Sequence, residues 1–170
     1  FDSLQVLCVN SKKVSAPLQD LTGLEECKNL VYLTMPSVES SAFPTFAKLD
    51  SVVKLFYGRD IVRTDVNVSD LSAFAQMKAL EVLWITGDLT QLTGAQLRTL
   101  TLDVTRIKSL EPLQQMPQLK ALQLVKGPEF PSFEPLDGSS IQYLDLLVSE
   151  GAANRYEAMD LTPLARMPQL

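Results

Sequence analysis

Histidine is absent from this 170-residue sequence, and cysteine occurs only twice. The missing histidine removes the commonest general base and the commonest metal ligand in proteins. The sequence also contains no Cys-x-x-Cys pair, no glycine-rich phosphate-binding loop and no G-x-S-x-G nucleophile turn. We therefore expect no catalytic residues, no metal site and no cofactor, and we predict that the protein is not an enzyme.

Positive charge and long apolar runs are also scarce. The formal net charge is −5, spread along the chain rather than gathered in a tail. Nucleic acids and anionic membranes are bound by surfaces with a positive field, so neither is an expected partner. No apolar run approaches the roughly 20 residues of a membrane-spanning helix, so no membrane insertion is expected. Asp60, Asp65 and Asp70 are spaced too widely for a calcium-binding loop and are predicted to be solvated.

Apolar residues are abundant, at 46% of the sequence, which is enough to fill the core of one domain. In the stretch 107–124 they recur at every third position and then at every second position. A period of three is too short for a long α-helix, at about 3.6 residues per turn, and fits short 3₁₀-like turns. A period of two is typical of a strand. The apolar positions are Ile107, Leu110, Leu113, Met116, Leu119, Leu122 and Leu124.

The same pattern recurs along the chain. Copies occupy 21–35, 43–57 and 71–85, another begins at 161, and shortened copies end at 102 and 146. Each ends in a segment of the form L-x-x-L-x-L, and successive segments start 17 to 29 residues apart. Self-similarity at this period predicts stacked structural repeats. The residues that start the segments are Leu4, Leu30, Val52, Leu80, Leu97, Leu119, Ile141 and Leu170.

These repeats resemble those of leucine-rich-repeat proteins. The segments 110–113, 133–136 and 161–164, each with a proline at its third position, are similar to convex segments of the internalin-like bacterial type. The resemblance implies an α/β fold: a right-handed solenoid with a parallel sheet on its concave face and short 3₁₀ or coil turns on its convex face. We expect one domain over residues 1–170, with about seven complete repeats and the start of an eighth. Neither end shows a polar cap, so we expect an excerpt of a longer chain.

The chain departs from the family at one position in each repeat. Eight residues after the strand start, where the family places asparagine, this sequence has Lys12, Val38, Asp60, Asp88, Thr105, Gly127 and Ser149. Val38 and Gly127 have no side-chain group that could replace the hydrogen bonds of asparagine. We therefore expect an irregular solenoid, and a non-repeating α/β domain remains the alternative fold.

Aspartate precedes four of the expected turns, in the segments Asp20-Leu21-Thr22, Asp70-Leu71-Ser72, Asp88-Leu89-Thr90 and Asp160-Leu161-Thr162. A carboxylate at this position can accept hydrogen bonds from the free N–H groups of a helical turn. We expect these aspartates to cap turns rather than to take part in catalysis.

The two cysteines are expected to face different surfaces. Cys27 lies in an apolar column of the convex segment and is predicted to be buried, whereas Cys8 alternates with Leu7 and Val9 and should face the other side of the first strand. A disulfide between them is therefore not expected. Unpaired thiols favour a reducing compartment, and a surface or secreted location stays open.

The side chains between the strand leucines should point onto the concave sheet. There Phe56 and Trp84 fall on consecutive strands, with Tyr32 diagonally beside them. Aromatic residues are enriched at binding hot spots, and exposed apolar patches often mark interaction sites. The predicted function is therefore non-catalytic binding of a protein partner. The predicted partner-binding residues are Tyr32, Phe56, Trp84, Val53, Val82 and Tyr143.

Two other functions remain open at this point. One is a structural spacer of a larger surface or secreted protein. The other is the targeting domain of an enzyme whose catalytic part lies outside this chain. The sequence identifies neither the partner nor the oligomeric state.

Overall fold

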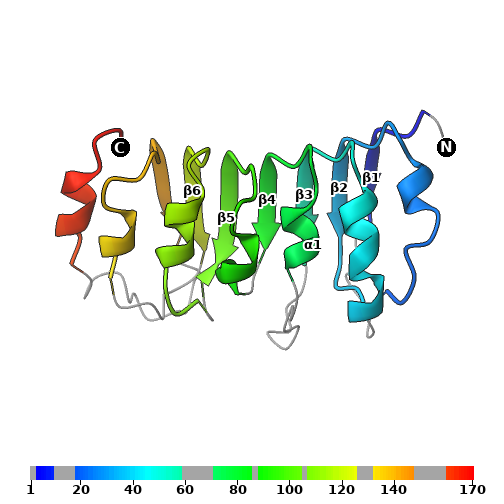
Figure 1. Ribbon diagram of the computed structural model, residues 1–170, viewed down its shortest axis with the longest axis horizontal. Helices are drawn as coiled ribbons and strands as arrows, with labels where there is room; N and C mark the ends of the chain where they lie inside the picture. The colour runs from blue at the N-terminus through cyan, green and yellow to red at the C-terminus, as the bar shows by residue number, and fades with distance from the viewer. Residues whose placement is uncertain are drawn as a thin grey trace.

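A single parallel sheet and a row of short helical turns form the two sides of the molecule. The computed structural model describes residues 3–9, 18–58, 71–85, 88–104, 107–125, 132–147 and 160–170. Within these ranges, seven strands lie side by side in the order in which they occur along the chain, as Figure 1 shows. The strands are β1 (Val6–Cys8), β2 (Tyr32–Met35), β3 (Lys54–Tyr57), β4 (Val82–Ile85), β5 (Thr99–Asp103), β6 (Ala121–Val125) and β7 (Tyr143–Leu147).

The strand leucines are stacked in register, as their spacing predicts. Leu33 is paired with Leu55, and Leu55 with Leu83. Further along the sheet, Leu122 is paired with Leu100 on one side and with Leu144 on the other. Leu122 is fully buried. Alternate strand residues share a face, so these leucines all enter the layer between the sheet and the turns. The predicted parallel sheet is confirmed.

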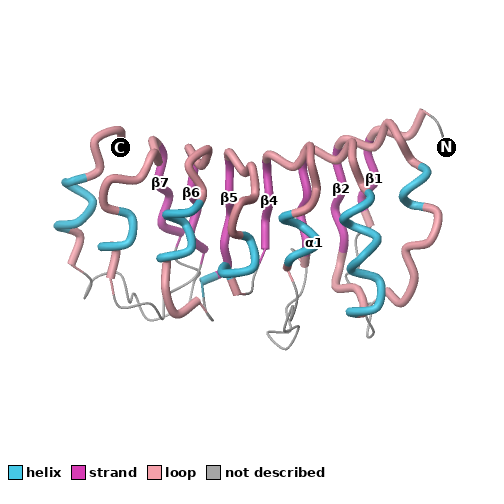
Figure 2. The backbone as a smooth tube through the Cα atoms, in the orientation of Figure 1, coloured by secondary structure: helices cyan, strands magenta, loops and turns pink. Residues whose placement is uncertain are grey.

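Short 3₁₀ turns cover the other side of this core (Figure 2). A 3₁₀ helix has three residues per turn, so side chains three apart point the same way. Leu110, Leu113 and Met116 accordingly lie on one side of their turn and are all buried. One four-residue segment is α-helical instead. The turns are η1 (Leu24–Glu26), η2 (Ser40–Lys48), α1 (Ser72–Ala75), η3 (Leu89–Leu92), η5 (Glu111–Gln115), η6 (Glu134–Leu136) and η8 (Thr162–Arg166).

An aromatic cluster replaces leucines in the core beside β3. The Phe43 and Phe46 rings of η2, the Tyr57 ring of β3 and the Phe74 ring of α1 meet with centroid distances of 4.9 to 6.0 Å. The backbone N–H of Val38 donates a hydrogen bond to the buried Tyr57 hydroxyl at 3.0 Å. A tyrosine from the next repeat thus supplies a hydrogen bond at the place where Val38 occupies the asparagine position. This contact was not expected from the sequence.

The capping aspartates behave as predicted wherever the structure describes them. In three segments the carboxylate accepts a hydrogen bond of 2.8 to 3.0 Å from the N–H of the threonine two residues later. The pKa of Asp20 and the pKa of Asp160 are both lowered. The hydrogen bond from the threonine hydroxyl has the largest effect, and the bond from the threonine N–H has the next largest. The fourth aspartate, Asp70, lies outside the described residues. The three threonines are Thr22, Thr90 and Thr162.

The two cysteines also lie where their positions predict. Cys27 is buried, Cys8 is exposed on the sheet, and both thiols are free. The longer spacings after the first, third and seventh strands predict loops at 10–20, 58–70 and 149–160, which fall mainly outside the described residues. In the described part of the chain, no helix is both long and apolar enough to cross a membrane.

Candidate interaction surface on the concave sheet

Two rows of side chains cross the sheet on the face that points away from the leucine core. Each row takes one residue from every strand, and neighbours in a row are register partners. Strands lie about 4.8 Å apart, so neighbours in a row are close enough to interact directly. The first row is Val6, Tyr32, Lys54, Val82, Thr99, Ala121 and Tyr143. The second row is Cys8, Thr34, Phe56, Trp84, Thr101, Gln123 and Asp145.

Aromatic side chains dominate strands β2 to β4 on this face. The rings of Tyr32 and Phe56 are stacked, with centroids 5.3 Å apart and planes inclined by 29°. Phe56 is the register partner of Trp84 on the next strand. We call these three residues the aromatic surface. All three are partly buried rather than fully exposed, because each is flanked by side chains of its own row and of the adjacent row. Val82, beside Trp84 in the first row, is also partly buried.

The other two predicted contact residues lie apart from this surface. Val53 precedes β3, and its N–H donates to the Val31 carbonyl at 2.9 Å, so it belongs to the rim where the strands begin. Tyr143 is 59% exposed, but it lies on β7, three strands beyond Trp84. The structure thus brings together Tyr32, Phe56, Trp84 and Val82 and leaves Tyr143 at the far edge of the sheet.

Polar side chains continue the second row beyond the aromatic surface. The Thr101 hydroxyl donates to Oε1 of Gln123 at 3.3 Å, and Nε2 of Gln123 donates to Oδ2 of Asp145 at 2.9 Å. We call these three residues the polar row. Thr101 is almost fully buried, whereas Gln123 and Asp145 are partly exposed. The polar row was not among the predicted contact residues, although its members hold the same strand position as Phe56 and Trp84.

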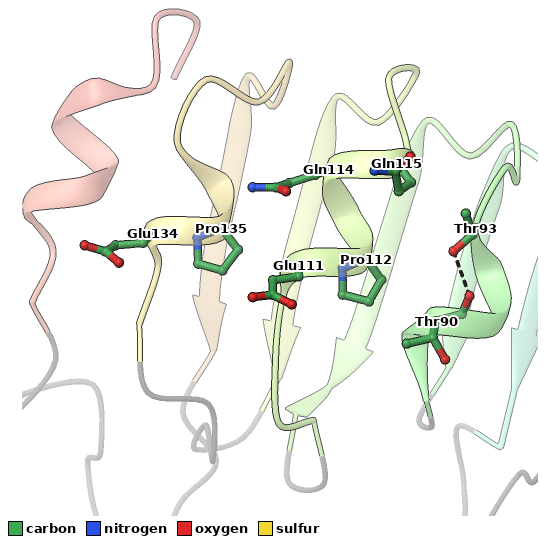
Figure 3. Close-up of a pocket in the computed structure, with 8 residues that line it drawn as sticks. All are labelled: Thr90, Thr93, Glu111, Pro112, Gln114, Gln115, Glu134 and Pro135. Carbon is green, nitrogen blue, oxygen red and sulfur yellow. Dashed lines mark hydrogen bonds between the residues drawn. The ribbon is translucent and has the colours of Figure 1, made fainter.

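The convex side carries a shallow, mainly polar hollow with a volume of about 510 Å³. Figure 3 shows its lining, in which Glu111 and Glu134 occupy equivalent places on η5 and η6 and each is followed by a proline. The hydroxyl of Thr93 donates to the Thr90 carbonyl at 2.7 Å. Across the described ranges, no group of three histidine, cysteine, aspartate or glutamate residues is arranged to hold a metal.

Comparisons with known proteins identify the class of fold. Neither a protein-family model nor a curated protein sequence matches the chain. Among solved structures, the chain is similar to internalin C2 of Listeria monocytogenes, with a TM-score of 0.59 and 17% identity over 97% of this chain and 77% of that one. The fold is a leucine-rich-repeat solenoid of the internalin type, as the resemblance of the repeats implies. Because the identity is only 17%, the similarity to internalin C2 supports a shared fold and not a shared function.

A second internalin of Listeria monocytogenes, InlF, is similar with a TM-score of 0.47 and 20% identity. That match covers 91% of this chain and 56% of the InlF chain.

Proposed function

We propose that this solenoid is a non-catalytic module that binds a protein partner on its concave sheet, with the aromatic surface as the main contact. The observation that carries the proposal is the placement of Tyr32, Phe56 and Trp84 on three consecutive strands, on the face opposite the leucine core. Leucine-rich-repeat folds of this type generally serve as protein-interaction scaffolds, which is consistent with this placement.

The aromatic surface has the properties of a binding hot spot. Aromatic rings are large and apolar and have few rotatable bonds, so a partner gains contact area at a low cost in conformational entropy. Both backbone sides of β2, β3 and β4 are hydrogen-bonded to neighbouring strands, so these side chains stand on a rigid base. The main competing role is structural, because cross-strand aromatic pairs also stabilise a sheet. The two roles differ in what the loss of Trp84 would change.

The test is a selection from a phage-displayed library of random linear 12-residue peptides on the immobilised wild-type chain. Selected peptides would then be measured by fluorescence anisotropy against Trp84→Ala. We expect Trp84→Ala to weaken their binding by at least about thirtyfold, which corresponds to the usual hot-spot threshold of about 2 kcal/mol. Its melting transition should stay near that of the wild type, because Trp84 is not part of the leucine core.

Leu161→Ala is the matched control, because Leu161 is a large exposed apolar residue, 48% accessible, next to η8 on the convex side. Its loss should leave peptide binding unchanged. Selected peptides that bind Trp84→Ala as tightly as the wild type would contradict the proposal. That result, with a lowered melting temperature for Trp84→Ala, would assign the aromatic surface to stability and favour the structural-spacer role.

A further inference from the structure

We infer that the partner segment is extended, crosses the strands, and places an apolar or aromatic residue on the aromatic surface and a basic residue at Asp145. This inference rests on the proposed function and adds the chemistry of the partner. It combines the aromatic surface with the polar row, because Phe56 and Trp84 lie in the same second row of the sheet as the polar row.

The register fixes the spacing of the two contacts. Trp84, Thr101, Gln123 and Asp145 are successive register partners on β4 to β7. Three steps of about 4.8 Å place Asp145 about 14 Å from Trp84 along the row. An extended chain rises about 3.3 Å per residue, so about four residues span this distance. Starting from Phe56, one strand earlier, about six residues are needed. The basic residue should therefore lie about four to six positions from the apolar one.

The charge of Asp145 identifies the partner group. Asp145 is the one acidic residue in the two rows, and Lys54, on β3, is the one basic residue. Among the described residues, the ion pairs join Lys78 to Asp50, Arg98 to Glu81 and Arg166 to Asp137, so none of them includes Asp145. The amide of Gln123 meets one carboxylate oxygen of Asp145.

A partner that covers the polar row removes water from this carboxylate. Burying a charge is costly unless a group of opposite charge or a strong hydrogen-bond donor replaces the water. Gln123 is uncharged and supplies one hydrogen bond, to Oδ2. A basic side chain compensates both the charge and the lost hydration of Asp145. An acidic or purely apolar residue at that position would be disfavoured.

The peptides selected on the wild-type chain provide the test. Peptides that depend on Trp84 should be enriched in arginine or lysine four to six positions from an apolar or aromatic residue. Asp145→Asn should weaken their binding at least about tenfold, since it removes the charge while Oδ1 of asparagine can still accept from Gln123. Glu134→Gln makes the same change on the convex side, in the hollow of Figure 3, and should have no effect.

Reversing the charge of Asp145 gives a second test of the contact between Asp145 and the basic residue of the peptide. Selection on Asp145→Lys should lose the preference for a basic residue and enrich acidic residues at that spacing. Peptides that need Trp84 but show no basic preference, or bind Asp145→Asn as tightly as the wild type, would overturn this inference and leave the proposed function standing. A selection that yields no peptide dependent on Trp84 would overturn both.

Discussion

Removal of one buried hydroxyl group, by Tyr57→Phe, tests whether a tyrosine replaces the missing asparagine of this repeat. Tyr57 is 1% exposed, and its hydroxyl is the acceptor for the backbone N–H of Val38 at 3.0 Å. The substitution leaves the ring in place among Phe43, Phe46 and Phe74. Packing is therefore retained, and the change is confined to the hydrogen bond.

The expected cost follows from the buried donor that the substitution leaves unpaired. A buried polar group without a partner costs about 1–3 kcal/mol. Urea denaturation should show this loss as a lower midpoint with an unchanged slope, because the surface exposed on unfolding stays the same. For a chain of this length the melting temperature should fall by about 2–4 °C for each kcal/mol lost.

Tyr143→Phe is the matched control, because it removes the same hydroxyl group from a tyrosine that is 59% exposed. It should leave the midpoint unchanged. A Tyr57→Phe protein as stable as the wild type would refute the reasoning and show that the Val38 N–H is satisfied in another way.

The titration of Tyr57 gives an independent check. Burial raises the pKa of the Tyr57 hydroxyl above its ordinary value of 10.0. A group whose pKa is higher in the folded state stabilises the fold below its unfolded pKa, and this contribution is lost as the pH rises through the folded pKa. The wild type should therefore lose stability above about pH 10 more steeply than Tyr57→Phe.

Two further predictions concern the core and the turn caps. Leu122→Ala should cost about 2–5 kcal/mol, because Leu122 is fully buried between Leu100 and Leu144, and a melting temperature unchanged within error would contradict the packing described. Asp160→Asn should weaken the acid dependence of stability, because the pKa of Asp160 is lowered in the folded state. The stabilisation from the Asp160 carboxylate is present above the unfolded pKa and is lost as the pH falls through the folded pKa. Urea midpoints at pH 7 and pH 3 measure this difference, and identical acid dependence in the two proteins would argue against the capping role.

The repeat architecture could be predicted from sequence because its periodicities are local. The change from a period of three to a period of two, as in the stretch 107–124, correctly separates turns from strands. The position of Leu122 in that pattern also gives its register with Leu100 and Leu144, since each repeat stacks on the next. The hydrogen bond between Val38 and Tyr57 could not be predicted in this way. It joins residues 19 positions apart through a hydroxyl that lies in an apolar column.

The candidate site was predicted in part. Alternation along each strand placed Tyr32, Phe56 and Trp84 on one face, and the structure confirms their proximity on neighbouring strands. Their partial burial was not foreseen, because exposure depends on the size of neighbours across strands. The bond between Gln123 and Asp145 was also missed, since the geometry of a side-chain amide and a carboxylate depends on rotamers that the sequence pattern does not determine.

The emission of Trp84, the single tryptophan of the sequence, tests the proposed contact surface most directly. A peptide selected on the wild-type chain and lacking tryptophan would be titrated into the protein while the emission wavelength and acrylamide quenching are followed. If the peptide covers the aromatic surface, the emission should shift to shorter wavelength and quenching should decrease in step with binding measured by anisotropy. Binding that leaves both the wavelength and the quenching of Trp84 unchanged would place the contact elsewhere on the solenoid.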